Sequence, residues 1–138
     1  MASNSLEFFF HPRSVAILGA SSNPASFGFD FMHHITSYGY RGNIYPVNPK
    51  QSEILGIKAY PSLDKIPDTV DFVVSCIGIP NIPTILPQCF QKGVKGLHIL
   101  AGRGSETGRA DAKEVEADIL RKAREYGIRV IGPNCLGV

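Results

Sequence analysis

The 138-residue sequence lacks any long apolar run, so it contains no candidate membrane span. Near its amino end only Leu6 and Phe8–Phe10 are apolar, and no basic segment precedes them, which does not fit a signal peptide. Cysteine is also scarce: Cys76, Cys89 and Cys135 show no C-x-x-C or histidine-containing spacing. An odd number of cysteines without an export signal predicts free thiols in a reducing, cytoplasmic environment.

Neither sign of charge is in clear excess. The 14 Lys and Arg residues and the 12 Asp and Glu residues give a net charge of +2, and they are scattered along the chain. This balance argues against nucleic acid or an anionic membrane as a partner. The four histidines form no metal-ligand pattern, so no metal site is expected. A hydrophobic content of 43% is typical of a single globular domain of this length.

Two phosphate-binding motifs are absent or incomplete. The pattern G-x-x-x-x-G-K-S/T of nucleotide hydrolases does not occur, and of the dinucleotide fingerprint G-x-G-x-x-G only the first glycine, Gly19, is in place. Even so, an apolar strand (Val15–Leu18), a turn of small residues and a helix follow one another here. The first N–H groups of a helix attract anions, and the hydroxyls of Ser21, Ser22 and Ser26 add donors. The alternative is a turn whose small residues serve only close packing.

Segments with strand and helix character alternate along the chain. Strands are predicted at about 15–19, 43–47, 70–77, 96–100 and 128–131. Helices are predicted at 27–37, at 81–92 with a kink or a late start near Pro87, and at 110–126. This alternation is typical of an α/β fold, a Rossmann-like doubly wound parallel sheet of about five strands in a single domain. We expect strand order 3-2-1-4-5, which would bring the loops 20–26 and 101–108 to one crevice.

Three side-chain placements follow from these elements. Helical spacing predicts that a stripe in the first long helix faces the core, and its members are Phe27, Phe31, Ile35 and Tyr38. Residues 6–10 are expected to form a short helical turn that packs on the sheet, and His98 to be a partly buried, hydrogen-bonded histidine in the fourth strand.

The residue after the second strand discriminates between nucleotide ligands. An NAD-binding domain places a carboxylate there to accept hydrogen bonds from the ribose hydroxyls. Here no carboxylate occurs before Glu53, and Lys50 offers a positive charge instead. A lysine suits a phosphate on the ribose, which favours NADP or coenzyme A over NAD. The alternative is a solvated loop lysine.

Four segments resemble, in order and spacing, the CoA-binding domain of ADP-forming acyl-CoA synthetases: 14–24, 44–50, 54–62 and 129–138. The Gly-Pro-Asn-Cys-Leu-Gly sequence in the last segment is the most specific. The amino-terminal domain of the succinyl-CoA synthetase alpha subunit is similar more distantly. The resemblance implies that residues 1–138 form the CoA-binding, amino-terminal domain of a longer ligase. Further domains, or a separate ATP-grasp subunit, would then complete the conversion of acid, CoA and ATP into acyl-CoA, ADP and phosphate.

The resemblance also implies which residues bind coenzyme A. The CoA phosphates would lie on the first turn, at Gly19, Ala20, Ser21, Ser22, Asn23 and Pro24, with Lys50 beside the ribose phosphate. The pantetheine arm would pass Ile99, Leu100, Ala101 and Gly102, and the thiol would meet the acyl group beside Pro133, Asn134 and Cys135. Arg103 stands where the family usually has an aromatic or aliphatic residue, and it offers a further charge for phosphate.

No catalytic residue is expected in this chain, because the family passes phosphate through a histidine in another domain. Two other functions stay open from the residues. One is a CoA-sensing module that regulates a fused acyltransferase. The other is an NADP-dependent reductase domain, which the missing fingerprint glycines disfavour.

Overall fold

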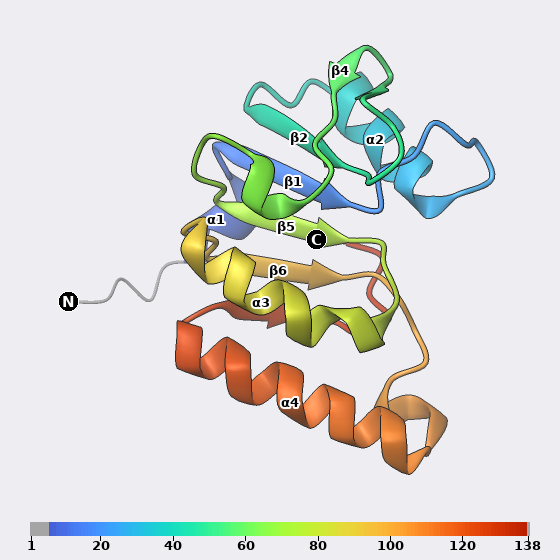
Figure 1. The fold of residues 1–138 in the computed structure, drawn as a ribbon, viewed down its shortest axis with the longest axis vertical. Coiled ribbons are helices and arrows are strands. Elements are labelled where there is room, and N and C mark those ends of the chain that lie inside the picture. The colour runs from blue at the N-terminus through green and yellow to red at the C-terminus, as the bar shows by residue number, and fades with distance from the viewer. Residues whose placement is uncertain (1–5, 138) are drawn as a thin grey trace.

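The computed structural model describes residues 6–137 and has a five-stranded parallel sheet at its centre (Figure 1). The sheet confirms the predicted α/β, Rossmann-like fold in a single small domain. Its strands, in chain order, are β1 (Ser14–Leu18), β2 (Asn43–Val47), β5 (Phe72–Ser75), β6 (Gly96–Ile99) and β7 (Arg129–Ile131). A small antiparallel hairpin of β3 (Glu53–Ile54) and β4 (Ile57–Lys58) lies between β2 and β5 in the sequence.

The helices agree closely with the sequence predictions. They are α1 (Glu7–Phe10), α2 (Phe27–Ser37), α3 (Ile82–Gln91) and α4 (Ala110–Tyr126), with 3₁₀ turns η1 (Leu63–Lys65), η2 (Ile79–Asn81) and η3 (Ser105–Thr107). Helix α3 begins at Ile82 rather than near Pro87, and the Asn81 side chain makes no capping hydrogen bond. Within residues 6–137, no helix combines the length and apolar character needed to cross a bilayer.

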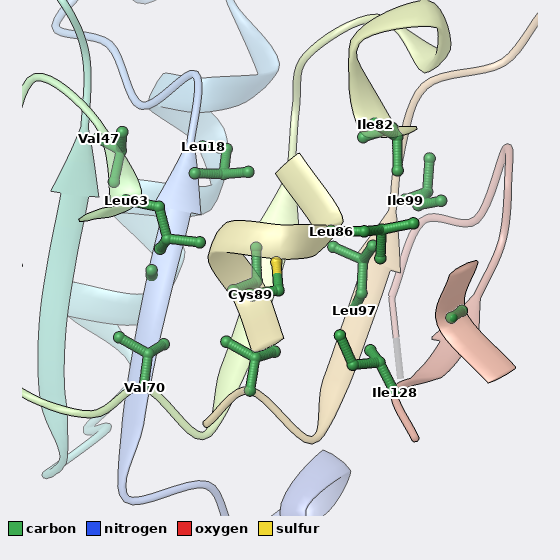
Figure 2. Packing of buried hydrophobic residues seen from close by; sticks show 14 of the residues in the cluster. Leu18, Val47, Leu63, Val70, Ile82, Leu86, Cys89, Leu97, Ile99 and Ile128 are labelled. Atoms are coloured by element: carbon green, nitrogen blue, oxygen red, sulfur yellow. The ribbon is translucent and has the colours of Figure 1, made fainter. Parts of the chain in front are cut away.

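Helices α3 and α4 pack on one face of the sheet and α2 on the other (Figure 1). The larger apolar core lies between the sheet and α3 and α4 (Figure 2). It contains fully buried residues of the strands and of α3, among them Leu97, Ile99, Ile82, Leu86 and Cys89. Cys89 therefore serves as a small apolar side chain. A second core cluster around Ile17 and Met32 lies under α2.

The strand order differs from the predicted one. The sheet runs β2-β1-β5-β6-β7, so in chain order the five strands are arranged 2-1-3-4-5 instead of 3-2-1-4-5. The outer edge of β2 is already occupied, because the Tyr60 N–H donates to the Pro46 carbonyl (2.9 Å) and the Asn48 N–H donates to the Tyr60 carbonyl (2.9 Å). Strand β5 pairs with the free edge of β1 instead. The winding therefore reverses between β1 and β5, and not between β1 and β6.

The buried face of α2 agrees only in part with the predicted stripe. Gly28 and Met32 are the buried residues, whereas Phe27 is 62% and Tyr38 80% exposed. Gly28 sets this orientation, since it lies directly against the Gly19 carbonyl. Phe31 and Ile35 are partly buried and pack against the second core cluster as predicted, and all four members of the stripe line one side of a groove of about 620 Å³ between α2 and the face of β5 and β6.

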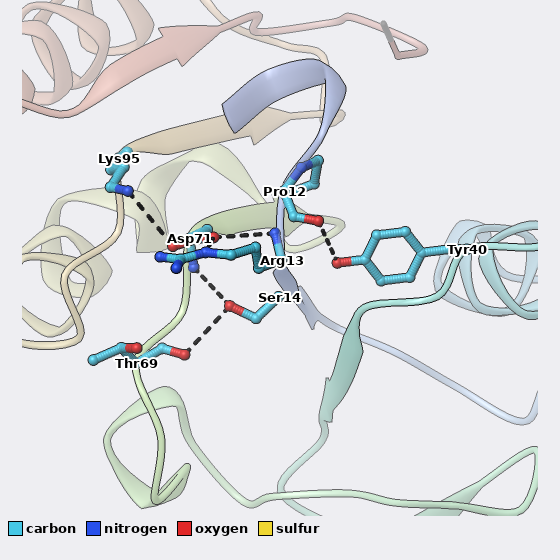
Figure 3. A network of polar contacts seen from close by, with 7 residues as sticks. All are labelled: Pro12, Arg13, Ser14, Tyr40, Thr69, Asp71 and Lys95. Carbon is cyan, nitrogen blue, oxygen red and sulfur yellow. Dashed lines mark hydrogen bonds and ion pairs between the residues drawn. The ribbon is translucent and has the colours of Figure 1, made fainter. Parts of the chain in front are cut away.

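A polar cluster ties the amino ends of the strands together (Figure 3). The Asp71 carboxylate accepts hydrogen bonds from the backbone N–H (3.0 Å) and Nε (3.2 Å) of Arg13, and the Lys95 ammonium lies 3.7 Å away. The Ser14 hydroxyl accepts from the Asp71 N–H and donates to the Thr69 carbonyl. Burial raises the pKa of Asp71, but its Arg13 hydrogen bonds and Lys95 outweigh burial and lower that pKa below its usual value.

Candidate functional site

Five loops follow the carboxyl ends of the parallel strands and lie along one edge of the sheet. Their order follows the strand order: 48–52, 19–26, 76–81, 100–109 and 132–137. Ligands of doubly wound sheets bind at this edge, where the winding reverses. All fourteen residues predicted to bind coenzyme A lie on or beside four of these loops.

The first turn has a well-defined internal structure. Gly19 has φ +78°, a conformation in which glycine is favoured, and its N–H donates to the Val47 carbonyl of β2 (3.1 Å). The Ser21 hydroxyl accepts from the Asn23 N–H (3.0 Å), and the Asn23 side chain accepts from the Ala25 N–H (3.0 Å). Residues 22–25 are exposed. The turn therefore presents small polar groups to solvent on a scaffold that is already hydrogen-bonded.

Helix α2 starts immediately after this turn and approaches it very closely. The Ser26 side chain caps the helix by accepting from the Phe29 N–H (3.2 Å). At Gly28 an added Cβ would lie 1.9 Å from the Gly19 carbonyl oxygen, so only glycine fits. Gly28 thus takes the part of a fingerprint glycine that allows close packing of helix and strand. Sequence reasoning missed this residue because it lies outside the G-x-G-x-x-G spacing.

The loop after β2 is joined to the first turn by side-chain amides. The Asn48 side chain donates to the Ala20 carbonyl (2.8 Å), and the Gln51 side chain accepts from the Ser22 N–H (3.1 Å). Asn48 also accepts from the Lys50 N–H (2.7 Å). The exposed Lys50 ammonium has no hydrogen-bond or ion-pair partner among residues 6–137. Lys50 therefore offers a positive charge without a partner, on a loop that is hydrogen-bonded to the first turn.

The loop after β6 differs electrically from the first turn. Backbone N–H groups of Glu106, Gly104 and Arg103 hold the pKa of the Glu106 carboxyl below its usual value. The Glu116 carboxylate accepts from the Ser105 N–H (2.7 Å). The Glu116 carboxylate already uses the Ser105 N–H, and together with Glu106 it brings negative charge to the loop that carries Arg103, so the loop is less suited to a phosphate than the first turn. An uncharged part of a ligand fits better along it.

The Pro-Asn-Cys turn packs against the end of β6. The Asn134 N–H donates to the Ala101 carbonyl (3.0 Å), and an added Cβ on Gly132 would lie 2.3 Å from the Ile99 carbonyl oxygen. Asn134 is exposed, and Pro133 and Cys135 are half-buried. The Cys135 thiol lies 3.6 Å from the Gly137 carbonyl, and among residues 6–137 it has no acidic or imidazole hydrogen-bond partner.

The structure therefore groups the predicted residues in two clusters. The loop that carries Lys50 is hydrogen-bonded to the first turn through Asn48 and Gln51, and Ala101 is hydrogen-bonded to the Pro-Asn-Cys turn. The two glycine-rich loops do not meet as predicted, because β5 and its loop 76–81 lie between them. From β2 to β7 the edge spans four strand spacings, or about 19 Å. A ligand that contacts both clusters must be long and extended.

Sequence reasoning also missed the loop after β5, which lies at the reversal of winding. An added Cβ on Gly19 would lie 3.1 Å from the Ile77 side chain and 3.5 Å from that of Cys76. Burial raises the pKa of the Cys76 thiol to about 12. Only knowledge of the strand order could have placed this loop beside Gly19.

Comparison with known proteins identifies the domain. The CoA binding domain model matches residues 13–138. Subunit alpha of the ADP-forming acetate–CoA ligase I of Pyrococcus furiosus is 43% identical, over 97% of this chain and 30% of its own length. The ADP-forming acetate–CoA ligase of Methanocaldococcus jannaschii is also 43% identical, over 96% of this chain and 18% of its own length.

A solved structure agrees with these sequence relatives. The dinucleotide forming acetyl-coenzyme A synthetase 1 of Ca. Korarchaeum cryptofilum, in complex with phosphate and ADP, superimposes with a TM-score of 0.91 at 35% identity. The match covers 97% of this chain and 28% of that one. The chain thus spans less than a third of the length of these relatives. It belongs to the CoA-binding domain family, and its resemblance to the domain of ADP-forming acyl-CoA synthetases is confirmed.

Proposed function

We propose that this domain binds coenzyme A as the amino-terminal module of an ADP-forming acyl-CoA synthetase. The observation that carries the proposal is the family match over residues 13–138, together with the arrangement of the predicted residues along one 19 Å edge. Coenzyme A is an extended molecule with phosphates at its nucleotide end and a thiol at the other. The edge has a positive charge at one end, at Lys50, for the phosphates. At its other end lies the turn that carries Cys135, which would take the thiol end.

The proposed placement assigns each part of the ligand to one cluster. The pyrophosphate lies at the turn of Gly19 to Pro24, where α2 begins, and the ribose phosphate lies at Lys50. The uncharged pantetheine arm follows Ile99 to Gly102. The charges support this direction, since the Lys50 ammonium has no partner among the described residues, whereas the Glu116 carboxylate already occupies the Ser105 N–H of the second loop.

Calorimetry distinguishes this proposal from a nicotinamide-binding reductase domain. The protein is titrated with CoA, dephospho-CoA, NADP and NAD under the same conditions. CoA is expected to bind most tightly, and dephospho-CoA more weakly because it lacks the ribose phosphate. Tight binding of NADP with no response to CoA would overturn the proposal.

Lys50→Ala tests the orientation of the bound ligand. A charged contact to phosphate contributes about 1.5–3 kcal/mol, so the variant is expected to lose about tenfold or more in affinity for CoA and little for dephospho-CoA. Lys113→Ala is the matched control, because it removes a lysine of α4 that is exposed as well. Equal losses for the two ligands would separate Lys50 from the ribose phosphate.

We further propose that this domain supplies CoA and that other domains or an ATP-grasp subunit carry out the chemistry. The two relatives named above are an acetate–CoA ligase subunit alpha and an acetate–CoA ligase, and each is more than three times its length. The 138-residue protein, mixed with acetate, ATP, Mg²⁺ and CoA, is therefore expected to form no thioester. Turnover by this chain alone would contradict the division of labour.

A further inference from the structure

A buried histidine stands in the middle of an otherwise apolar sheet face. His98 is 1% exposed, and its register neighbours are Val74 on β5 and Ile131 on β7. The Phe31 ring of α2 contacts it edge-on, with ring centroids 5.7 Å apart. A polar ring in such surroundings is costly unless it is hydrogen-bonded. Its hydrogen-bond partner therefore indicates why it is there.

That partner is distant in the sequence. The Nε2 atom of His98 lies 2.7 Å from the backbone carbonyl oxygen of Cys135, 37 residues later. A carbonyl can only accept, so Nε2 carries the proton and donates it. The hydrogen bond thus joins the centre of β6 to the Pro-Asn-Cys turn. Among residues 6–137, no other side chain joins this turn to the sheet by a hydrogen bond.

The remaining attachments of the turn are one backbone hydrogen bond and packing contacts with the loop after β6. The Asn134 N–H donates to the Ala101 carbonyl, and Gly132 lies against the Ile99 carbonyl. Leu136, which follows, is 83% exposed. The turn is therefore held at its start and middle by the Asn134 backbone hydrogen bond and by packing, and at Cys135 by the hydrogen bond from His98. Removing the imidazole would free the end that carries Cys135.

We propose that His98 is a positioning residue for the CoA site, which holds the Pro-Asn-Cys turn in place without touching the ligand. This inference rests on the proposed function, because it assigns that turn to the thiol end of the CoA site. The buried imidazole donates to the Cys135 carbonyl from the sheet side of the turn. Its loss leaves the residues of the turn unchanged but lets them move.

Three variants separate positioning from packing. His98→Leu keeps an apolar side chain of similar size and removes the donor, whereas His98→Gln keeps an amide donor at a similar reach. Val74→Ala is the matched control, since it creates a small cavity next to His98 on the same face but removes no hydrogen bond. CoA affinity is expected to fall about threefold to tenfold in His98→Leu and to be largely retained in the other two.

A second measurement tests the attachment of the turn without CoA. Cys135 is half-buried, whereas burial raises the pKa of Cys76 and Cys89 to about 12, so iodoacetamide should modify Cys135 first. Peptide mass spectrometry then measures its rate of alkylation. The rate is expected to rise in His98→Leu and to stay near that of the unaltered protein in His98→Gln and Val74→Ala.

The outcomes of the two measurements distinguish the proposed function from the proposed role of His98. If the unaltered protein does not bind CoA, the proposed function is wrong, and the alkylation rates still decide whether His98 holds the turn. If CoA binds but His98→Leu binds it equally well, the positioning role is overturned. An unchanged alkylation rate in His98→Leu, or equal effects of Val74→Ala and His98→Leu, would reduce His98 to a packing residue.

Discussion

Replacing Gly28 with alanine adds one methyl group where α2 meets the first turn. The new Cβ would lie 1.9 Å from the Gly19 carbonyl oxygen and 2.9 Å from its carbon, whereas ordinary van der Waals contact begins at 3.4 Å. Both atoms belong to the backbone, so neither can rotate away. Helix α2 must therefore move as a unit away from β1, or the turn must deform.

The sign of the effect follows from two opposing contributions. In an open helix, changing glycine to alanine stabilises by about 1 kcal/mol, because alanine has the higher helix propensity. Overpacking a close contact costs about 1–3 kcal/mol. The overlap at Gly28 involves backbone on both sides, so the cost should lie at the upper end of that range, at about 2–3 kcal/mol, and exceed the gain. We expect Gly28→Ala to lower the free energy of unfolding by about 1–2 kcal/mol.

Urea unfolding followed by circular dichroism measures this change, and Gly78→Ala is the control. Gly78 has φ −61°, and an added Cβ there meets nothing closer than 3.8 Å, so its stability should change by less than about 0.5 kcal/mol. Because the contact also sets where α2 begins, Gly28→Ala should weaken CoA binding as well. A Gly28→Ala protein as stable as the original would refute the reasoning.

Three further predictions concern the core, the polar cluster and the thiols. Met32→Ala is expected to cost about 2–5 kcal/mol because Met32 is fully buried, whereas Tyr38→Ala should stay within about 0.5 kcal/mol; urea midpoints that reverse this ranking would contradict the orientation of α2. Asp71→Asn should lose about 1–3 kcal/mol at pH 7. Because the folded-state pKa of Asp71 is lowered, its contribution is present above the unfolded-state pKa of about 3.9 and is lost as the pH falls through the folded value. Unfolding at pH 7 and pH 3 should thus show a smaller difference between the two proteins in acid, and a constant difference would argue against it. In the native protein at pH 8, Cys89 should react with a maleimide far more slowly than Cys135, and equal rates would contradict the burial of Cys89.

Local patterns were enough to predict the elements and their type. The small-residue turn after Val15–Leu18, the boundaries of the helix 27–37 and the end of the helix 110–126 depend on neighbouring residues and their own backbone preferences. The match of four segments to one domain family likewise depends only on residue order and spacing. These features are encoded within short stretches of the chain, so they can be read without three-dimensional information.

The arrangement of those elements was decided by contacts between distant residues. Tyr60 occupies the outer edge of β2, so β5 pairs with β1 and separates two loops that were predicted to meet. The contact of Gly28 with Gly19 turns α2, so that Met32 is buried and Tyr38 is exposed. The hydrogen bond from His98 to Cys135 is likewise invisible in the sequence, because nothing near either residue specifies its partner. The sequence alone therefore determined the family and the residues of the candidate site. Which strand edge was free for pairing, and how closely the backbone of α2 could pack, decided how the loops that carry these residues are arranged.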